Sequence, residues 1–299
     1  MQISKIGEFG LIERFRRFIK TDKTVAVASG DDCAAIKYTA NKYLLYTCDM
    51  IIEGVDFLPK DNPALIGRKA LAVSISDIAA CGGIPRYCVV ALGLPKNFSV
   101  AKAEKLASGL FKLAKEFKVN VVGGDISRSD RLVIDVSMLG VVEKKNLVLR
   151  SGARAGDIIF VSGRLGGSIR GKHLDFSPRV RESRYLVNNF RINSMCDISD
   201  GLIQDLGHIL DNSSTGAVLY EELIPLSRAA VNLDDALYGG EDFELLFTLS
   251  RKEALRLRAG KPYDFYPIGS IMPKKFGLKL IDAKGREKRL KARRGFRHF

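Results

Sequence analysis

The sequence contains no tryptophan and only three histidines, His173, His208 and His298. With so few imidazoles and no G-x-S-x-G segment, we expect neither a Ser-His-Asp nor a Cys-His catalytic group. The five cysteines form no C-x-x-C pair and are odd in number. We therefore expect free thiols in a reducing cytoplasm and no zinc site. No apolar run approaches the roughly 18 residues of a membrane span, and we expect no signal peptide and no membrane partner.

Acidic residues recur in one kind of setting, beside Gly, Ser, Thr or Cys at the end of an apolar run. In the first case, Asp31 and Asp32 follow Gly30 and the apolar run 25–28, which indicates a turn at a strand end. Similar pairs are Cys48-Asp49, Ser76-Asp77, Gly124-Asp125, Cys196-Asp197 and Ser199-Asp200. Two carboxylates about 4 Å apart repel by roughly 4 kcal/mol at an effective dielectric of about 20. If these acids converge, a cation must hold them together, and Mg²⁺ is the best candidate.

The formal net charge of +14 leaves a nucleic-acid-binding protein as an alternative. However, the excess is spread over expected helix faces and concentrated in residues 284–297, with little aromatic interleaving. A basic surface around an acidic, metal-filled cleft would also attract polyphosphates. We therefore expect no nucleic-acid partner.

Hydrophobic periodicity and glycine punctuation predict alternating strands and helices in both halves of the chain. Asn62-Pro63 is a good helix start and places Asp77 in the last turns of that helix. Expected helices are 8–20, 63–80, 99–117, 178–190 and 202–210, with a helical region after Gly163. Expected strands are 25–28, 43–47, 86–92, 119–122, 132–142, 158–162, 194–198, 217–220 and 243–249. This alternation favours two α/β units of similar size.

One segment resembles a nucleotide-binding loop without meeting its requirements. Residues 166–172 read Gly-Gly-Ser-Ile-Arg-Gly-Lys and follow an expected strand. A P-loop needs Ser or Thr as the next residue because that hydroxyl holds Mg²⁺, and here the next residue is His173. We therefore do not expect a P-loop.

The acidic motifs, taken in order, resemble those of the thiamine-monophosphate kinase family, within the superfamily typified by aminoimidazole ribonucleotide synthetase. The similarity covers almost the whole chain. Its motifs are Gly7–Gly10, Gly30–Asp32, Thr47–Asp49, Glu53–Phe57, Ser76-Asp77, Val122–Asp125, Asp197–Leu202, Gly239–Asp242 and the closing Gly295–Phe299.

This resemblance implies a cytoplasmic enzyme that uses ATP and several Mg²⁺ ions to convert thiamine monophosphate to thiamine diphosphate by direct in-line transfer. It implies a mixed α/β, two-domain PurM-like fold, with residues 1–146 forming a homodimer and residues 147–299 a C-terminal α/β domain. The implied Mg²⁺ ligands are Asp32, Thr47, Asp49, Asp77, Asp125, Asp197 and Asp200. The implied ATP contacts are Gly124, Asp125, Arg150 and Ser199, and the implied substrate contacts are Asp56, Glu241 and Phe296.

The chemistry of that reaction agrees with the abundance of aspartate. The acceptor is a phosphate whose second pKa is about 6, so it is mostly dianionic at neutral pH and needs no catalytic base. Bound cations would screen the repulsion between the two anions. Three positions differ from the usual family residue: Asp56 stands for His, Phe296 for Trp and Cys48 for Thr. A neutral thiol is a poor ligand for a hard cation, so Cys48 is left out of the expected ligands.

Two further hypotheses remain open at the level of sequence. One is a different ATP-dependent enzyme of the same superfamily, such as an aminoimidazole ribonucleotide synthetase. The other is a basic nucleic-acid-binding protein without catalysis, for which the retained acids have no role.

Overall fold

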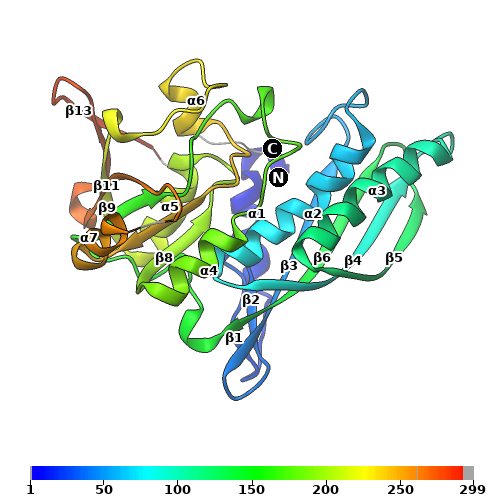
Figure 1. Cartoon of the computed structure of the whole chain (residues 1–299), viewed down its shortest axis with the longest axis horizontal. Helices are drawn as coiled ribbons and strands as arrows, with labels where there is room; N and C mark the ends of the chain where they lie inside the picture. Colours follow the sequence, from blue (N-terminus) through cyan, green and yellow to red (C-terminus); the bar gives the residue numbers. More distant parts are fainter. Residues whose placement is uncertain (1, 261, 292–299) are drawn as a thin grey trace.

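Two β-sheets organise the molecule, one from each half of the chain (Figure 1). The computed structural model describes residues 2–260 and 262–291. The first sheet has the order β1-β2-β3-β6-β4-β5, and all its neighbours are antiparallel except the parallel pair β4 and β5. Its strands are β1 (Val25–Val27), β2 (Ala34–Lys37), β3 (Lys42–Ile52), β4 (Ile84–Leu94), β5 (Asn120–Arg128) and β6 (Val133–Glu143).

The second sheet has the order β13-β12-β9-β11-β7-β10-β8. Its neighbours are antiparallel except for the parallel pair β12 and β9. Its strands are β7 (Ile158–Val161), β8 (Ile192–Asp197), β9 (Thr215–Tyr220), β10 (Leu245–Leu249), β11 (Tyr266–Pro273), β12 (Leu278–Ile281) and β13 (Glu287–Arg289).

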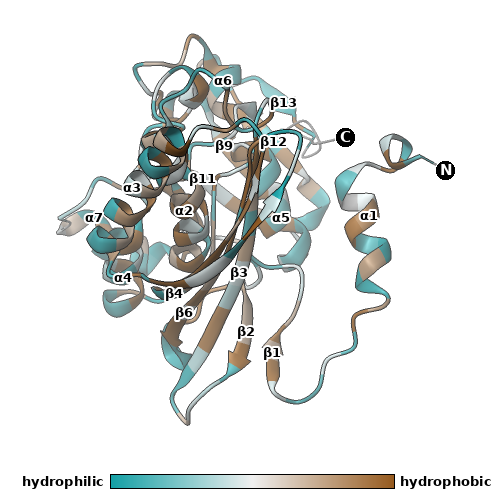
Figure 2. Ribbon diagram, turned by 90° about the vertical axis from the view of Figure 1, so that its right-hand side faces the viewer, coloured by the Kyte–Doolittle hydropathy of each residue, from teal (hydrophilic) through white to brown (hydrophobic). Residues whose placement is uncertain are grey.

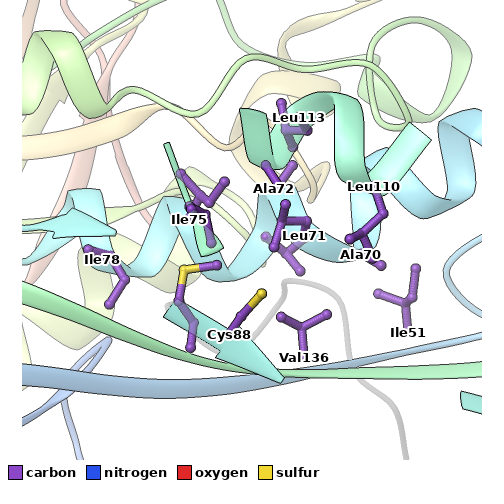
Figure 3. Close-up of a cluster of buried hydrophobic side chains, with 14 of the residues drawn as sticks. Ile51, Ala70, Leu71, Ala72, Ile75, Ile78, Cys88, Leu110, Leu113 and Val136 are labelled. Carbon is purple, nitrogen blue, oxygen red and sulfur yellow. The ribbon is translucent and has the colours of Figure 1, made fainter. Parts of the chain in front are cut away.

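Helices α2 (Pro63–Ala80) and α3 (Val100–Phe117) cover one face of the first sheet. The Asn62 side chain accepts a hydrogen bond from the Ala64 amide, and Ser99 caps α3 in the same way through the Lys102 amide. Apolar side chains of both helices meet those of β3, β4 and β6 in a continuous core, as Figure 3 shows for Leu71, Leu110 and Val136. This core fixes α2 on the sheet, and α2 carries Asp77, one of the expected Mg²⁺ ligands.

The remaining α-helices are α1 (Gly7–Arg16), α4 (Val180–Asn189), α5 (Leu202–Ser213), α6 (Leu233–Tyr238) and α7 (Arg251–Ala259). Helix α4 and strand β8 come from the second half of the chain and pack against α2. Within the described part of the chain, no helix combines the length and apolar character needed to span a membrane.

Helices α2 and α3 approach each other at glycines. A Cβ on Gly67 would lie 2.0 Å from the Leu106 carbonyl oxygen, and one on Gly109 would lie 1.8 Å from that of Ala64. Any side chain at these positions would push the two helices apart.

The opposite face of the first sheet carries exposed apolar side chains. Tyr46, Met50, Tyr87 and Val89 are each between 44% and 55% exposed. Figure 2 shows α2 and α3 on one side of this sheet and α1 standing away on the other side. This exposed surface is called the open face below.

The mixed α/β fold class is confirmed, and the expected helices at 63–80, 99–117 and 202–210 are present within a few residues. The helical region expected after Gly163 is wrong, because only the short 3-10 helix Ser168–Arg170 forms there. Gly166 and Gly167 both have positive φ, which ends regular structure before a helix can form. Strand β5 is longer than expected and runs straight through Gly123–Asp125.

Candidate active site

Four separate elements bring aspartates together at the turn between β1 and β2. The turn between β1 and β2 carries Asp32, the middle of β3 carries Asp49, the end of α2 carries Asp77 and the end of β8 carries Asp197. Carboxylate oxygens of Asp32, Asp77 and Asp197 all lie within 4.8 Å of one another. Both halves of the chain therefore contribute to a single acidic group, which we call the aspartate cluster (Asp32, Asp49, Asp77, Asp197).

Each member of the aspartate cluster accepts hydrogen bonds from a neighbouring side chain. Arg150 binds Asp32 Oδ1 through Nε at 3.0 Å and Nη2 at 2.5 Å. Hydroxyl groups serve the other three carboxylates, with Ser74 donating to Asp49 at 2.7 Å, Thr47 to Asp77 and Ser76 to Asp197. These bonds fix the orientation of the carboxylates but neutralise only one of them.

The buried carboxylates of the cluster repel one another, and this repulsion and their burial raise their pKa values. Burial raises the pKa of Asp49 to about 6 and that of Asp197 to about 7, and the charge of Asp32 adds to both shifts. Burial also raises the pKa of Asp77 well above its ordinary value, and the charges of Asp49 and Asp197 raise it further. Burial and the charge of Asp32 raise the pKa of the neighbouring Asp31 to about 7.

The residues of this cluster fit a divalent cation. Asp32 Oδ2 is buried and has no hydrogen-bond partner among the described residues. An unpaired buried carboxylate oxygen is costly unless a cation or donor satisfies it. Several carboxylates with a threonine hydroxyl are the oxygen-rich donor set that Mg²⁺ prefers.

A second acidic group lies at the start of α5. Asp200, Asp205 and His208 offer ligand atoms that lie within 4.8 Å of one another. Asp205 accepts hydrogen bonds from the amides of Asp200 and Gly201, each at 3.1 Å, and burial raises its pKa. Burial and the charge of Arg150 lower the pKa of His208 to about 4, so the imidazole is neutral at pH 7.

Glu241 lies at the junction of the two halves, in the loop before β10. Its carboxylate forms an ion pair with Lys69 of α2 and lies 3.3 Å from His173 Nδ1. Asp56 is close by, because the same Lys69 donates to its carbonyl oxygen at 2.7 Å. The Asp56 carboxylate accepts a hydrogen bond from the Ile52 amide at 2.7 Å, so one of its oxygens is used locally. Phe296 lies outside the described residues.

Comparison with known proteins identifies the family. Residues 30–142 match the family model described as AIR synthase related protein, N-terminal domain, and residues 150–279 match the corresponding C-terminal domain. The thiamine-monophosphate kinase of Buchnera aphidicola subsp. Acyrthosiphon pisum is 35% identical over 99% of each chain. That of Aquifex aeolicus is 35% identical over 83% of this chain and 87% of its own. The chain belongs to the thiamine-monophosphate kinase family.

A solved structure of that family shares the fold over its whole length. The structure described as AaThiL complexed with AMPPCP and TMP has a TM-score of 0.87 and 31% identity, covering 100% of this chain and 99% of the solved one. A structure of HypE from E. coli, 21% identical with a TM-score of 0.74, shares the fold alone. The sequence-based resemblance to thiamine-monophosphate kinases is thus confirmed, as is the fold that it implied.

The structure groups most of the residues expected to bind metal but not all of them. Asp32, Thr47, Asp49, Asp77 and Asp197 lie together, and Asp200 belongs to the neighbouring group on α5. Asp125 lies elsewhere, on the edge strand β5, which β6 and β4 separate from β3. Three strand spacings of about 4.8 Å place it roughly 14 Å from that strand.

Asp125 also lies on the open face. Asp125 pairs in register with Ala91 of β4, Ala91 with Asp135 of β6, and Asp135 with Met50 of β3. Residues paired in this way share one face of the sheet, and Met50 is 55% exposed on that face. The Asp49 side chain is on the other face, where it meets Ser74 of α2. Within one protomer, the sheet therefore separates Asp125 from the aspartate cluster.

A cavity of about 460 Å³ lies at the same edge, between α3 and strands β4 and β5. Gly124 and Asp125 line it, together with apolar side chains such as Leu92, Leu106 and Leu110. A Cβ on Gly124 would lie 1.9 Å from the Val90 carbonyl oxygen, so β4 and β5 can pair closely here only because this residue is glycine.

Arg150 and Ser199, expected at the nucleotide, lie beside the acids of the two groups. The Arg150 amide also donates to Asp31, at 3.1 Å from Oδ2. Ser199 accepts a hydrogen bond from the Glu241 amide at 2.7 Å through its carbonyl oxygen. Both residues thus connect acidic motifs that are distant in sequence.

The segment that resembles a P-loop binds carboxylates of the protein itself. The Gly166 amide and the Ser168 hydroxyl donate to Asp242, which is fully buried. Lys172 pairs with Glu244 at 2.7 Å, and Arg179 holds the same carboxylate. The segment therefore anchors the loop that carries Glu241, and the Gly166 amide, the Ser168 hydroxyl and Lys172 are engaged by the protein itself.

Sequence reasoning missed the side chains that hold the expected residues in place. These are Lys69, Ser74, Ser76, His173 and Asp205. Lys69 had a visible signal, because it stands beside Arg68 in a helix stretch, 65–75, that is otherwise mostly apolar. The hydroxyls and His173 had none, since their partners are distant in the sequence.

Proposed function

We propose that this protein transfers the γ-phosphoryl group of ATP to the phosphate of thiamine monophosphate, giving thiamine diphosphate and ADP. The observation that carries the proposal is the aspartate cluster, assembled from both halves of the chain in a member of the thiamine-monophosphate kinase family. Clustered carboxylates with an unpaired buried oxygen fit a magnesium-dependent reaction between two anions. All five cysteines are free thiols, which is typical of the cytoplasm, where we place the reaction.

The protein's part in this reaction is to bind and orient the two phosphates. Asp32, Thr47, Asp49, Asp77 and Asp197 would hold Mg²⁺, with Asp200 on the neighbouring helix. When bound, the metal ions would screen the negative charge of the two phosphates. Arg150 holds Asp32 in place and would provide a guanidinium to the phosphates. No side chain needs to remove a proton, because the acceptor phosphate is already ionised.

The substrates would occupy opposite ends of this site. Gly124 and Asp125 line a largely apolar cavity that suits the base of ATP, while Ser199 lies near the phosphate region. Glu241 and Asp56 would face the cationic thiamine half of the acceptor, with Phe296 supplying an aromatic face. This assignment gives each expected binding residue a role, and Asp125 would act from the face of the sheet opposite the aspartate cluster of its own protomer.

We also propose a homodimer formed through the N-terminal domain, residues 1–146, with residues 147–299 as the second domain. Its interface would be the open face, whose exposed apolar side chains are costly to leave in water. Helix α1 adds the exposed apolar side chains of Ile12 and Phe15, and the exposed Phe18 and Ile19 follow it. A second copy of the same chain can cover both surfaces symmetrically.

The direct test is an assay with purified protein, ATP, Mg²⁺ and thiamine monophosphate. Thiamine diphosphate should form, and Asp32→Asn should abolish it. The matched control is Asp211→Asn, an exposed acid on α5 outside both acidic groups, which should retain activity. A folded wild-type protein that forms no thiamine diphosphate would reject the proposal.

A further inference from the structure

Lys69 is a fully buried charge that the proposed reaction does not use directly. It lies in the middle of α2, and its exposed fraction is 0%. Burying an ammonium group is very costly unless it is paired and hydrogen-bonded. Its contacts therefore indicate what the charge is for.

The Lys69 ammonium joins two segments that we assign to the thiamine substrate. It donates to the Asp56 carbonyl oxygen at 2.7 Å, in the loop after β3. It also donates to Glu241 Oε1, in the loop before β10. One side chain of the first domain thus fixes a substrate-side loop from each half of the chain.

The second carboxylate oxygen of Glu241 faces His173 without a well-aligned hydrogen bond. Oε2 is buried and has no aligned hydrogen bond among the described residues, and the same is true of His173 Nδ1, 3.3 Å away. Glu241 has a φ of +66°, a conformation that is rare for residues other than glycine and common at functional sites. Burial raises the pKa of Glu241, but His173 and Lys69 lower it more, so the carboxylate is ionised.

We propose that Lys69 is a positioning residue that fixes the Glu241 carboxylate for binding of the thiamine substrate. The inference rests on the proposed function, because it takes Glu241 as a substrate contact. By holding Oε1, Lys69 orients Oε2 toward a cationic or N–H-bearing ligand and keeps the carboxylate ionised. Because Lys69 also holds the Asp56 loop, it sets the distance between the two sides of the substrate site.

Lys69→Met tests this role through the kinetic constants for each substrate. The KM for thiamine monophosphate should rise by about tenfold to a hundredfold, the loss expected for one hydrogen bond to a charged group. The KM for ATP should not change. The control is Arg68→Met, the neighbouring cation on α2, which pairs with Asp175 at 2.8 Å and with the Phe176 carbonyl but not with Glu241. Arg68→Met should leave both KM values unchanged.

A double-mutant cycle separates positioning from general stabilisation. In a Glu241→Gln background, Lys69→Met should raise the KM for thiamine monophosphate much less than in the wild type, because only its hydrogen bond to the Asp56 carbonyl remains to be lost. If Lys69→Met does not fold, Lys69→Gln replaces it, since the amide keeps one donor. An equal rise of both KM values, or an unchanged effect in the Glu241→Gln background, would overturn the inference. An inactive wild-type protein would instead reject the proposed function.

Discussion

Asp77 is expected to favour Mg²⁺ binding and to lower the stability of the metal-free protein. Its carboxylate is buried against other carboxylates of the aspartate cluster, and its pKa is raised by burial and by its neighbours' charges. Without a cation this arrangement destabilises the fold, and functional sites often retain such groups. The hydrogen bond from Thr47 alone does not offset the repulsion.

Asp77→Asn should therefore stabilise the metal-free protein while removing function. We expect the free energy of unfolding in EDTA to rise by about 0.5–2 kcal/mol, because one buried negative charge is lost without a change of shape. Mg²⁺ should raise the melting temperature of the wild type but not of the variant. Urea unfolding and thermal melts with and without Mg²⁺ measure both effects, and a less stable variant in EDTA would contradict the argument.

The same residues predict a dependence of stability on pH. The ordinary Asp pKa is 3.8, and it is raised to about 6 at Asp49 and to about 7 at Asp31 and Asp197. Between these values the folded state binds more protons than the unfolded state, so the free energy of unfolding falls as pH rises. The metal-free protein should lose stability between about pH 4 and about pH 7, as these groups ionise.

Urea titrations in EDTA at several pH values, at constant ionic strength, measure this loss. Other groups also titrate, so the comparison with Asp77→Asn isolates the contribution of the cluster. The variant should lose less stability over the same range. Equal slopes for the two proteins would show that the cluster does not control the pH dependence.

At the scale of elements, the position of α2 depends on its contact with α3. Gly109→Ala would place a Cβ 1.8 Å from the Ala64 carbonyl oxygen, so the two helices would have to separate. We expect a loss of about 1–3 kcal/mol in the free energy of unfolding and weaker Mg²⁺-induced stabilisation, because α2 carries Asp77. The control is Ser108→Ala, an exposed position on the same helix, which should leave stability and metal binding nearly unchanged.

Elements with strong local signals were predictable from the sequence. Asn62-Pro63 and Ser99 act as helix starts by hydrogen bonds within a few residues, so α2 and α3 were placed closely. The repeated Asp motifs also predicted that these acids converge, but not the distances between them. Strands β11 and β12 were missed, because their pairing depends on β7 and β9, far away in the chain. Strand β13, which pairs only with β12 among the described strands, was missed with them.

The arrangement around Glu241 could not be predicted in the same way. Its partners Lys69 and His173 are 172 and 68 positions away, and their contacts follow from the packing of both halves. Asp125 presents the reverse case, because its motif was clear but the sequence does not say which face of the sheet it occupies. A shift of one residue in register would place it on the other face.

At the scale of the whole molecule, α2 connects the two domains into one site. It packs on the first sheet and contacts α4 and β8 of the second half (Figure 1). Its Lys69 side chain bonds Glu241 of the second half. Ser76 holds Asp197 of β8, and the Ala79 carbonyl accepts a hydrogen bond from Ser183 of α4. Any motion between the domains would therefore change the aspartate cluster and the Glu241 loop together.

The open face extends this dependence to a second protomer. Asp125 lies on the face that the proposed dimer would cover, whereas Asp32 lies in the cluster on the other side of the sheet. If the dimer brings Asp125 to the cluster of the partner protomer, each active site needs both chains. Two inactive chains, each mutated in a different part of the shared site, would then form an active heterodimer.

Co-expression of Asp32→Ala and Asp125→Ala chains with different tags tests this arrangement. We expect each homodimer to be inactive and the purified heterodimer to regain activity, because one of its two sites receives an intact Asp32 and an intact Asp125. The control pair is Asp32→Ala with Asp77→Ala, which both lie in one protomer's cluster, so that heterodimer should stay inactive in either arrangement. Activity only in the first heterodimer would show that Asp125 acts across the interface. If the first heterodimer is inactive, Asp125 serves the site of its own chain, and ATP must then reach from the edge strand β5 to the cluster within one protomer.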